Sequence, residues 1–254
     1  MKASRENDSL AGEAYVILRE RILRGELSIG QVISRRKLAS QLGMSLLPVS
    51  EAMLRLEHEG LLESRPRAGT RIRVPTPQDV RGNYIVREAL EVQAAKLFAE
   101  IATPDEHAEL LKLAARVDLL SAHADGSRFH YLSLHEKLHR RIAECARCPA
   151  LTDAIEKTHA LSSTWRCAAR GVSQAEPYRR HQELVDALSR GDPALAGEAM
   201  RQHIQAALGN ALLRLKPYFQ ISKQPGESYA RSAKRRVQVN LSEAQGASAE
   251  ALSA

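Results

Sequence analysis

The chain has 254 residues, a hydrophobic content of 44% and a formal net charge of +7, values that fit a protein of two domains with packed cores. No apolar run approaches the roughly 18–20 residues that span a bilayer, and the first residues lack the apolar stretch of a signal peptide. We therefore expect a cytoplasmic protein with no membrane partner.

Charge is concentrated towards the two ends of the chain. Residues 1–76 hold 13 Lys or Arg against 9 Asp or Glu, residues 77–213 hold 17 against 18, and residues 214–254 hold 7 against 3. A basic head and tail around a near-neutral middle suit a polyanion-binding end joined to a domain that binds something else. An ordinary solvated surface explains such an excess of positive charge equally well, so sequence motifs must distinguish the two interpretations.

Residues 12–75, after an N-terminal extension at 1–11, contain three helix signals in a row. The apolar periodicity predicts a first helix over 13–24. Ser34 then caps a short helix that stops before Gly43, and Ser45 caps a second one.

The segment after this second helix predicts a β-hairpin. It follows Gly60 and reads L-L-E-S-R-P-R-A-G-T-R-I-R-V, with alternating arginines and a glycine at its tip. Two short helices joined by a glycine-containing turn and followed by such a hairpin indicate a winged helix-turn-helix. In that arrangement the second helix enters the major groove of DNA, and the wing touches the backbone or the minor groove.

Residues 76–216 predict an all-α domain without a convincing strand. Thr76, Pro77 and Asp79 form the signature of a helix start, which recurs at Thr103 and Asp192. Six helices are expected, at 77–102, 104–123, 127–146, 149–170, 174–190 and 192–215.

The C-terminal residues 217–254 are rich in Ser, Gln, Ala and Gly, with a basic run at 234–236. This composition predicts a largely disordered basic tail.

Three cysteines, Cys145, Cys148 and Cys167, cannot all pair within one chain. Cys145 and Cys148 form a single C-x-x-C, for which a redox or metal role is one reading. Because no second pair completes a zinc site, we interpret them as small helix residues that pack in the interior.

Four histidines lie at spacings that suit helical metal ligands. His135 and His139 are four residues apart in L-H-E-K-L-H, so both imidazoles project from one face of a helix. His181 and His203 stand alone on later amphipathic stretches. The pattern predicts a metal-bearing domain joined to a DNA-binding one.

The string L-S-I-G-Q-V-I-S-R-R-K-L-A-S-Q-L-G-M-S-L-L-P-V-S-E-A-M-L-R-L-E-H-E-G-L-L-E-S-R-P-R-A-G-T resembles the N-terminal domain of GntR-type bacterial transcription regulators. The middle of the chain resembles the FadR-type C-terminal effector domain, abbreviated FCD. The strings that carry this second likeness are R-E-A-L-E at 87–91, H-R-R-I-A-E-C-A-R-C-P-A-L at 139–151, H-Q-E-L-V-D-A-L-S-R-G-D at 181–192 and M-R-Q-H-I at 200–204.

The resemblance covers about residues 12–214. It implies a homodimer that binds palindromic operator DNA and is not an enzyme. It also implies that the affinity for DNA changes when a small carboxylate or related metabolite enters the FCD bundle, often beside a bound metal.

The family's metal site carries over with one departure. Members usually show an Asp and a His four apart, followed by single histidines on two later helices, and here His135 stands at the Asp position. His139, His181 and His203 match the other positions. A neutral nitrogen in place of a hard oxygen favours zinc, nickel or copper over manganese or magnesium, and we expect zinc or nickel.

This all-histidine ligand set has no charge of its own, which makes an effector carboxylate at an open coordination position attractive. The alternative is that His135 points elsewhere in the pocket.

Arg87 is the first candidate for holding the effector carboxylate, because a planar guanidinium offers a bidentate fork. The alternative is an ion pair on the helix with Glu91, one turn on. Arg166, beside Trp165, is a second candidate.

The DNA-binding half departs from its family as well. Family recognition helices usually begin S-R-T-P-V-R, whereas this one begins S-L-L-P-V-S, so Leu46 and Ser50 stand at the arginine positions. Each bidentate arginine contributes roughly 1–3 kcal/mol of discrimination, so their loss should alter or relax the operator, while added cations should strengthen phosphate binding. The predicted DNA-binding residues are Arg35, Arg36, Lys37, Ser45, Ser50, Arg55, Arg65, Arg67, Gly69, Thr70 and Arg71.

Two other functions remain open at this point. Residues 135–139 match the H-E-x-x-H pattern of zinc proteases literally, so a metal-dependent hydrolase is the alternative, although it needs a third ligand and a substrate cleft. A purely structural dimeric bundle would show no effector-dependent change in DNA affinity. We interpret the chain as a DNA-binding transcription regulator.

Overall fold

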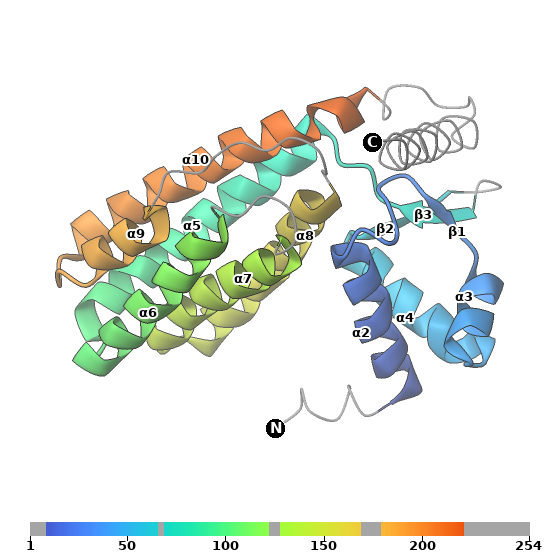
Figure 1. Cartoon of the computed structure of the whole chain (residues 1–254), viewed down its shortest axis with the longest axis horizontal. Helices are drawn as coiled ribbons and strands as arrows, with labels where there is room; N and C mark the ends of the chain where they lie inside the picture. Colours follow the sequence, from blue (N-terminus) through green and yellow to red (C-terminus); the bar gives the residue numbers. More distant parts are fainter. Residues whose placement is uncertain (1–8, 66–68, 122–127, 169–178, 221–254) are drawn as a thin grey trace, which may run out of the picture.

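The computed structural model describes residues 9–65, 69–121, 128–168 and 179–220, without the side chains of 128, 129 and 166–168. These residues form two units, a small one with a three-stranded sheet and a larger helical bundle (Figure 1). This agrees with the predicted mainly α fold, a winged helix-turn-helix followed by an all-α domain. No described helix is long and apolar enough to cross a membrane.

The small unit contains helices α2 (Leu10–Leu23), α3 (Arg35–Leu42) and α4 (Leu46–His58). Its sheet has the order β1-β3-β2, in which β2 (Leu62–Arg65) and β3 (Gly69–Ile72) are the predicted wing. The sequence did not indicate β1 (Val32–Ile33), because two residues are too short to show an alternating pattern.

Caps explain where α3 and α4 begin and end. The side chain of Ser34 accepts a hydrogen bond from the backbone of Lys37, and Gly43 ends α3 with a φ of 65°. That left-handed conformation disfavours other residues. Ser45 is the N-cap residue of α4, but its side chain makes no capping hydrogen bond, so the predicted cap is correct in position only.

The core of the small unit joins the inner faces of its three helices to the sheet. Its fully buried apolar residues include Ala14, Leu18, Ile22, Val49, Ala52, Met53, Leu56, Leu61, Leu62 and Ile72.

The connection between the units is fixed by a capping box. Thr76 Oγ1 accepts from the backbone of Asp79, while the Asp79 carboxylate accepts from the backbone of Thr76. Arg73, just after the wing, lies 2.8 Å from the same carboxylate. Asp79 therefore ties the end of the wing to the first helix of the bundle.

The described part of the bundle contains six helices, the predicted number. Helix α5 lies against α10 along much of its length, and the other four cover the same side of this pair (Figure 1). Their bounds are α5 Pro77–Ile101, α6 Pro104–Ser121, α7 Arg128–Cys145, α8 Pro149–Ala168, α9 Arg180–Leu188 and α10 Pro193–Phe219.

Two helix ends differ from the expected ones. Ser9 caps α2, so this helix starts at Leu10 rather than at 13. Helix α10 continues through Pro217 to Phe219, because Tyr218 and Phe219 pack against the bundle core and offset the backbone hydrogen bond that a proline removes. The predicted start of α9 at 174 and the tail beyond 220 lie outside the described residues.

Cys145 is buried and Cys148 half-buried, and both carry free thiols. Burial raises the pKa of Cys145 to about 11, so the thiol stays protonated and packs as a small apolar group. The side chain of Cys167 lies outside the described part of the chain.

We predict that Thr76→Ala lowers the free energy of unfolding by about 1 kcal/mol, because it removes one half of the capping box. Urea denaturation followed by circular dichroism measures the change. Thr76→Ser keeps the oxygen and is the matched control, so an equal loss in both variants would contradict the capping role.

Candidate functional site

The four predicted histidines meet at the centre of the bundle. They come from three helices, with His135 and His139 on α7, His181 in the first turn of α9 and His203 on α10. All four are at least 93% buried. The ring centroids of His135 and His139 lie 4.5 Å apart, and the ring of His203 lies 5.2 Å from that of His139 and 5.1 Å from that of His181.

The nitrogens of three of these histidines are close enough together to approach one ion. Ligand atoms of His135, His139 and His203 all lie within 4.8 Å of one another. Two nitrogens about 2.1 Å from one zinc ion are at most about 4.2 Å apart, so a small closure of the rings would suffice. His139 Nε2, His181 Nε2 and His203 Nδ1 are buried and have no hydrogen-bond partner among the described residues. Such atoms cost about 1–3 kcal/mol each unless something binds them.

A carboxylate stands behind two of the four imidazoles. Asp118 Oδ1 lies 2.6 Å from Nδ1 of His181, and Glu91 Oε2 lies 2.5 Å from Nδ1 of His139 in a contact that is short but not aligned as a standard hydrogen bond. A carboxylate in this position holds the proton on Nδ1 and leaves the Nε2 lone pair for a metal. Nε2 of both residues has no hydrogen-bond partner among the described residues, and Nδ1 of His139 has only the misaligned contact with Glu91.

Asp118 also fixes the helix that carries His181. It accepts hydrogen bonds from the backbone amides of His181 and Gln182, whereas the N-cap residue of α9, Arg179, offers no side-chain cap. Burial by itself would raise the pKa of Asp118, but these hydrogen bonds outweigh it and lower the pKa. No sequence signal indicated this role, because 63 residues separate the two partners.

Arg87 lies beside the histidine cluster but already has partners. Its Nε donates to Glu91 Oε1 at 2.8 Å, which is the ion pair considered as the alternative to effector binding. The other guanidinium nitrogens lie 3.4 Å from Ser162 Oγ and 3.2 Å from His159 Nε2. Arg87 is 1% exposed. The side chain of Arg166 lies outside the described part of the chain.

Sequence reasoning missed His159, which is buried on α8 with Nε2 at 3.0 Å from Glu91 Oε1. Glu91, His139 and His159 form a second group with the spacing of metal ligands. The guanidinium of Arg87 touches both Glu91 and His159, and a fixed cation there disfavours a second ion. We therefore interpret Glu91 and His159 as residues that hold the His139 ring in place and not as ligands of a second metal ion.

The charge of the site differs from the expectation drawn from the ligands alone. The four imidazoles are neutral donors, but buried Asp118 and Glu91 supply two negative charges behind them, one of which Arg87 offsets. Burial would raise the pKa of Glu91, but Arg87 and the neighbouring histidines hold it well below its usual range. An ion at this site would therefore be partly compensated without an effector.

Burial also keeps the imidazoles in the form that binds metals. It lowers the pKa of His139 to about 3 and the pKa of His203 well below its usual range. Both rings are thus neutral at pH 7, with a lone pair available.

The predicted DNA-binding residues fall into two groups. Arg35, Arg36 and Lys37 are exposed in the first turn of α3, and no described residue forms an ion pair with them. Ser50 Oγ donates to the Leu46 carbonyl at 2.8 Å, so its hydroxyl is bonded within α4.

The predicted DNA-binding residues of the wing are less available to DNA than the sequence suggested. Glu63 on β2 lies 2.5 Å from Arg71 of the neighbouring strand β3 and 3.7 Å from Arg65 of its own strand, which offsets the charge of the wing. Thr70 is buried and hydrogen-bonded to Ser64, and Gly69 has a φ of 79° that suits the end of the hairpin loop. Arg67 lies outside the described residues.

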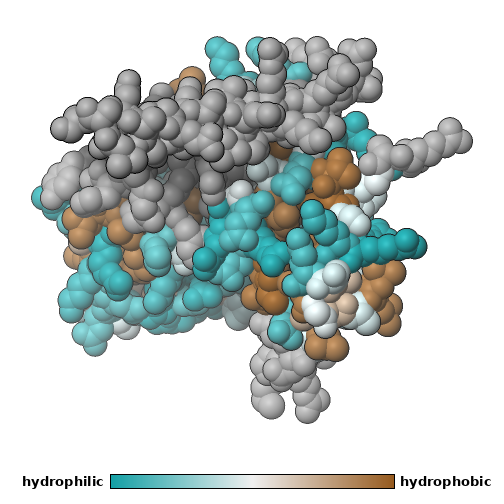
Figure 2. Space-filling model, turned by 45° about the vertical axis from the view of Figure 1, so that its right-hand side comes forward, coloured by the Kyte–Doolittle hydropathy of each residue, from teal (hydrophilic) through white to brown (hydrophobic). Residues whose placement is uncertain are grey.

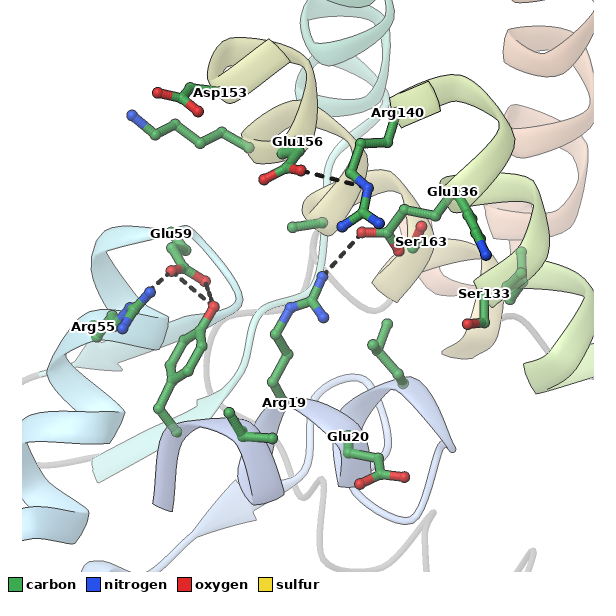
Figure 3. Close-up of a pocket in the computed structure, with 17 residues that line it drawn as sticks. Arg19, Glu20, Arg55, Glu59, Ser133, Glu136, Arg140, Asp153, Glu156 and Ser163 are labelled. Atoms are coloured by element: carbon green, nitrogen blue, oxygen red, sulfur yellow. Dashed lines mark hydrogen bonds and ion pairs between the residues drawn. The ribbon is translucent and has the colours of Figure 1, made fainter. Parts of the chain in front are cut away.

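Arg55 also differs from the prediction. Its guanidinium lies over the ring of Tyr15, 3.9 Å from the centroid, and 3.4 Å from Glu59. It lines a cleft between the two units instead of joining the cations of α3 (Figure 3).

Comparison with known proteins supplies the family. Residues 10–72 match the bacterial regulatory proteins of the gntR family, and residues 84–206 match the FCD domain. A "Probable D-xylose utilization operon transcriptional repressor" of Paenarthrobacter nicotinovorans is 32% identical over 193 residues, 74% of this chain and 82% of that protein. The chain belongs to the GntR family of transcription regulators.

Further comparisons give similar sequences and a similar fold. The HTH-type transcriptional repressor RspR of Escherichia coli is 26% identical over 197 residues, 76% of this chain and 85% of that one. The solved structure of E. coli McbR/YncC has a TM-score of 0.67 at 23% identity, covering 81% of this chain and 98% of that one. The solved structure of a putative GntR regulator from Rhodococcus sp. RHA1 has a TM-score of 0.66 at 23% identity. The match covers 80% of this chain and 97% of that one.

The GntR assignment makes the protein a DNA-binding transcription regulator and not a hydrolase. Geometry adds a separate argument, because the glutamate of H-E-x-x-H must face the metal to act as a base. Glu136 instead faces the cleft between the units, 3.3 Å from Arg19 (Figure 3).

We predict that acid destabilises the metal-free protein through these buried imidazoles. An unfolded histidine binds a proton near pH 6.5, but His139 does so only near pH 3. The unfolded state therefore binds more protons between these values, and the stability present above pH 6.5 is lost as the pH falls.

Urea denaturation at pH 6.5 to 4 tests this. His139→Gln should make the fall in unfolding free energy shallower by about 1.4 kcal/mol per pH unit. His58→Gln, which removes an exposed imidazole, should leave it unchanged. Equal slopes in His139→Gln and the parent would contradict the prediction.

Proposed function

We propose that this GntR-type protein is a FadR-type homodimer whose affinity for a palindromic operator is controlled in the FCD domain. In this proposal His135, His139, His181 and His203 hold a divalent transition metal, and a small carboxylate effector binds beside it. The observation that carries the metal site is the pair of carboxylates that set His139 and His181 with Nε2 unpartnered.

The donor set fits a metal of borderline softness. Imidazole nitrogens suit zinc, nickel and copper, whereas magnesium and calcium prefer oxygen ligands. We propose zinc or nickel. When bound, such an ion supplies a positive centre with an open coordination position for an anion.

Arg87 remains our candidate for the effector carboxylate, in a modified role. Its Nε is held by Glu91 at 2.8 Å, while its other nitrogens make the longer contacts to Ser162 and His159. A carboxylate that replaces these two contacts would receive two hydrogen bonds from a guanidinium that is already oriented. The curated relatives are named for different pathways or for none, so the effector class rests on this chemistry.

Two helices provide a route from the bundle to the DNA-binding domain. On α7, Glu136 directly follows His135 and lies 3.3 Å from Arg19 on α2. On α8, Leu161 lies between His159 and Ser162 and packs against the core of the winged domain. A shift of either helix at the site would therefore move a contact of the DNA-binding domain.

The space around these contacts allows such movement. A cleft of about 950 Å³ separates α2 and α4 from α7 and α8, and Arg19 crosses it to reach Glu136 (Figure 3). The linker over 74–77 contains two prolines and is short and stiff. The orientation of the winged domain should then depend on the arrangement of the bundle.

We predict that Asp118→Asn weakens binding of nickel or zinc by about 10- to 100-fold, because it removes the charge that orients His181. Competition with a chromophoric chelator measures the affinity for the metal, and elemental analysis measures the metal content of the purified protein. Asp153→Asn, on the exposed surface of α8, is the matched control.

Direct removal of a ligand should have a larger effect. His139→Ala and His181→Ala should lower metal content and the metal-dependent gain in melting temperature together, since binding at a folded site adds to stability. Unchanged metal content in either variant would contradict the four-histidine site.

We predict that Glu136→Gln uncouples the two domains while leaving each folded, because the pair with Arg19 is partly exposed and contributes little to stability. The ratio of operator affinities with and without nickel should fall towards one from a coupling of about 5- to 150-fold. Fluorescence anisotropy on a duplex selected by the parent protein measures this ratio.

Glu156→Gln is the control, because Glu156 faces the same cleft but pairs with Arg140 within the bundle. It should keep the parent ratio. A parent-like ratio in Glu136→Gln would contradict the proposed route.

A further inference from the structure

The recognition helix α4 presents apolar side chains where it would enter DNA. Leu46 and Leu47, in its first turn, are 48% and 67% exposed, and Leu54 is 65% exposed. The opposite face of α4 is buried in the core of the winged domain. Much of the surface of these leucines is therefore not covered by the described residues. Large exposed apolar groups of this kind mark a contact surface.

The surroundings of this surface indicate a polyanion. Arg35, Arg36 and Lys37 are exposed on the helix that packs against α4 and form no ion pair with described residues. Apolar side chains lie next to hydrophilic ones over this part of the molecule (Figure 2). The cations suit phosphates on either side of the groove, and the leucines would face its floor.

The floor of the major groove has one apolar feature. It is the C5-methyl group of thymine, whereas the other base edges there present hydrogen-bond donors and acceptors. Residues in the first turn of a recognition helix contact base edges. In its present rotamer the Ser50 hydroxyl donates its proton to the Leu46 carbonyl, so it could only accept a hydrogen bond from a base.

We propose that Leu46 and Leu47 read thymine C5-methyl groups in the operator. Helix α4 then recognises bases through apolar contacts. The cations of α3 bind phosphates, which adds affinity for DNA of any sequence. This inference rests on the DNA-binding activity of the family and is independent of the metal and the effector. It further implies that 5-methylcytosine, which carries the same methyl group, can replace thymine at a contacted position.

The experiment removes single methyl groups from DNA. Duplexes are selected from a random pool by the full-length protein, and each thymine of the selected site is then replaced by deoxyuridine. Burial of one methyl group corresponds to about a threefold to fourfold change in affinity. We expect a loss of this size at the contacted thymines and none at the others.

Protein variants connect the effect to the two leucines. Leu46→Ala and Leu47→Ala should each abolish the difference between thymine and deoxyuridine at one position, while the dependence of affinity on salt stays as in the parent. Leu54→Ala, equally exposed but two turns further along α4, should keep the difference. Leu46→Arg should shift the selected base towards guanine.

Three results would overturn the proposal. The first is equal affinity for thymine and deoxyuridine at every position of the site. The second is a difference that survives in both alanine variants. The third is a selection that yields no preferred sequence, which would leave these leucines without a reading role while phosphate binding by the domain persisted.

Discussion

Burial of polar groups at the centre of the helical bundle is the constraint on which the site depends. Five imidazoles, two carboxylates and one guanidinium lie together with almost no exposure to water, and each polar group without a partner costs stability. Asp118 bonds to Nδ1 of His181, and Glu91 lies against Nδ1 of His139. Nε2 of both rings has no partner among the described residues, which is the physical argument for the proposed metal.

The same constraint explains why Arg87 lies where it does. A carboxylate buried without a cation would be protonated or expelled, and Arg87 keeps Glu91 ionised beside His139. Arg87, His159 and Ser162 then form a polar wall one helix away from the winged domain. Helices α7 and α8 thus each have one face in the histidine site and another against the winged domain. Glu136 of α7 pairs with Arg19, and Leu161 of α8 packs against the core of that domain.

In the winged domain, affinity and specificity are carried by different side chains. The exposed cations on α3 form no ion pair with described residues, whereas Glu63 offsets two wing arginines, Arg65 and Arg71. The exposed leucines of α4 offer no hydrogen bond to a base. Apolar contacts give only modest discrimination per base, so the proposed dimer would need several such contacts to recognise its operator.

The sequence determined the local features of this protein. Caps and glycines set most helix ends because these signals act within a few residues, as at Ser34, Gly43 and Thr76. The His135–His139 pair followed from helical periodicity, and family motifs located His181 and His203. Only the tertiary structure decided which carboxylates stand behind the histidines, that Glu136 faces the cleft and that Arg55 lies over Tyr15. These facts depend on the packing of helices far apart in the chain, and spacing along a sequence carries no information about the rotation of one helix against another.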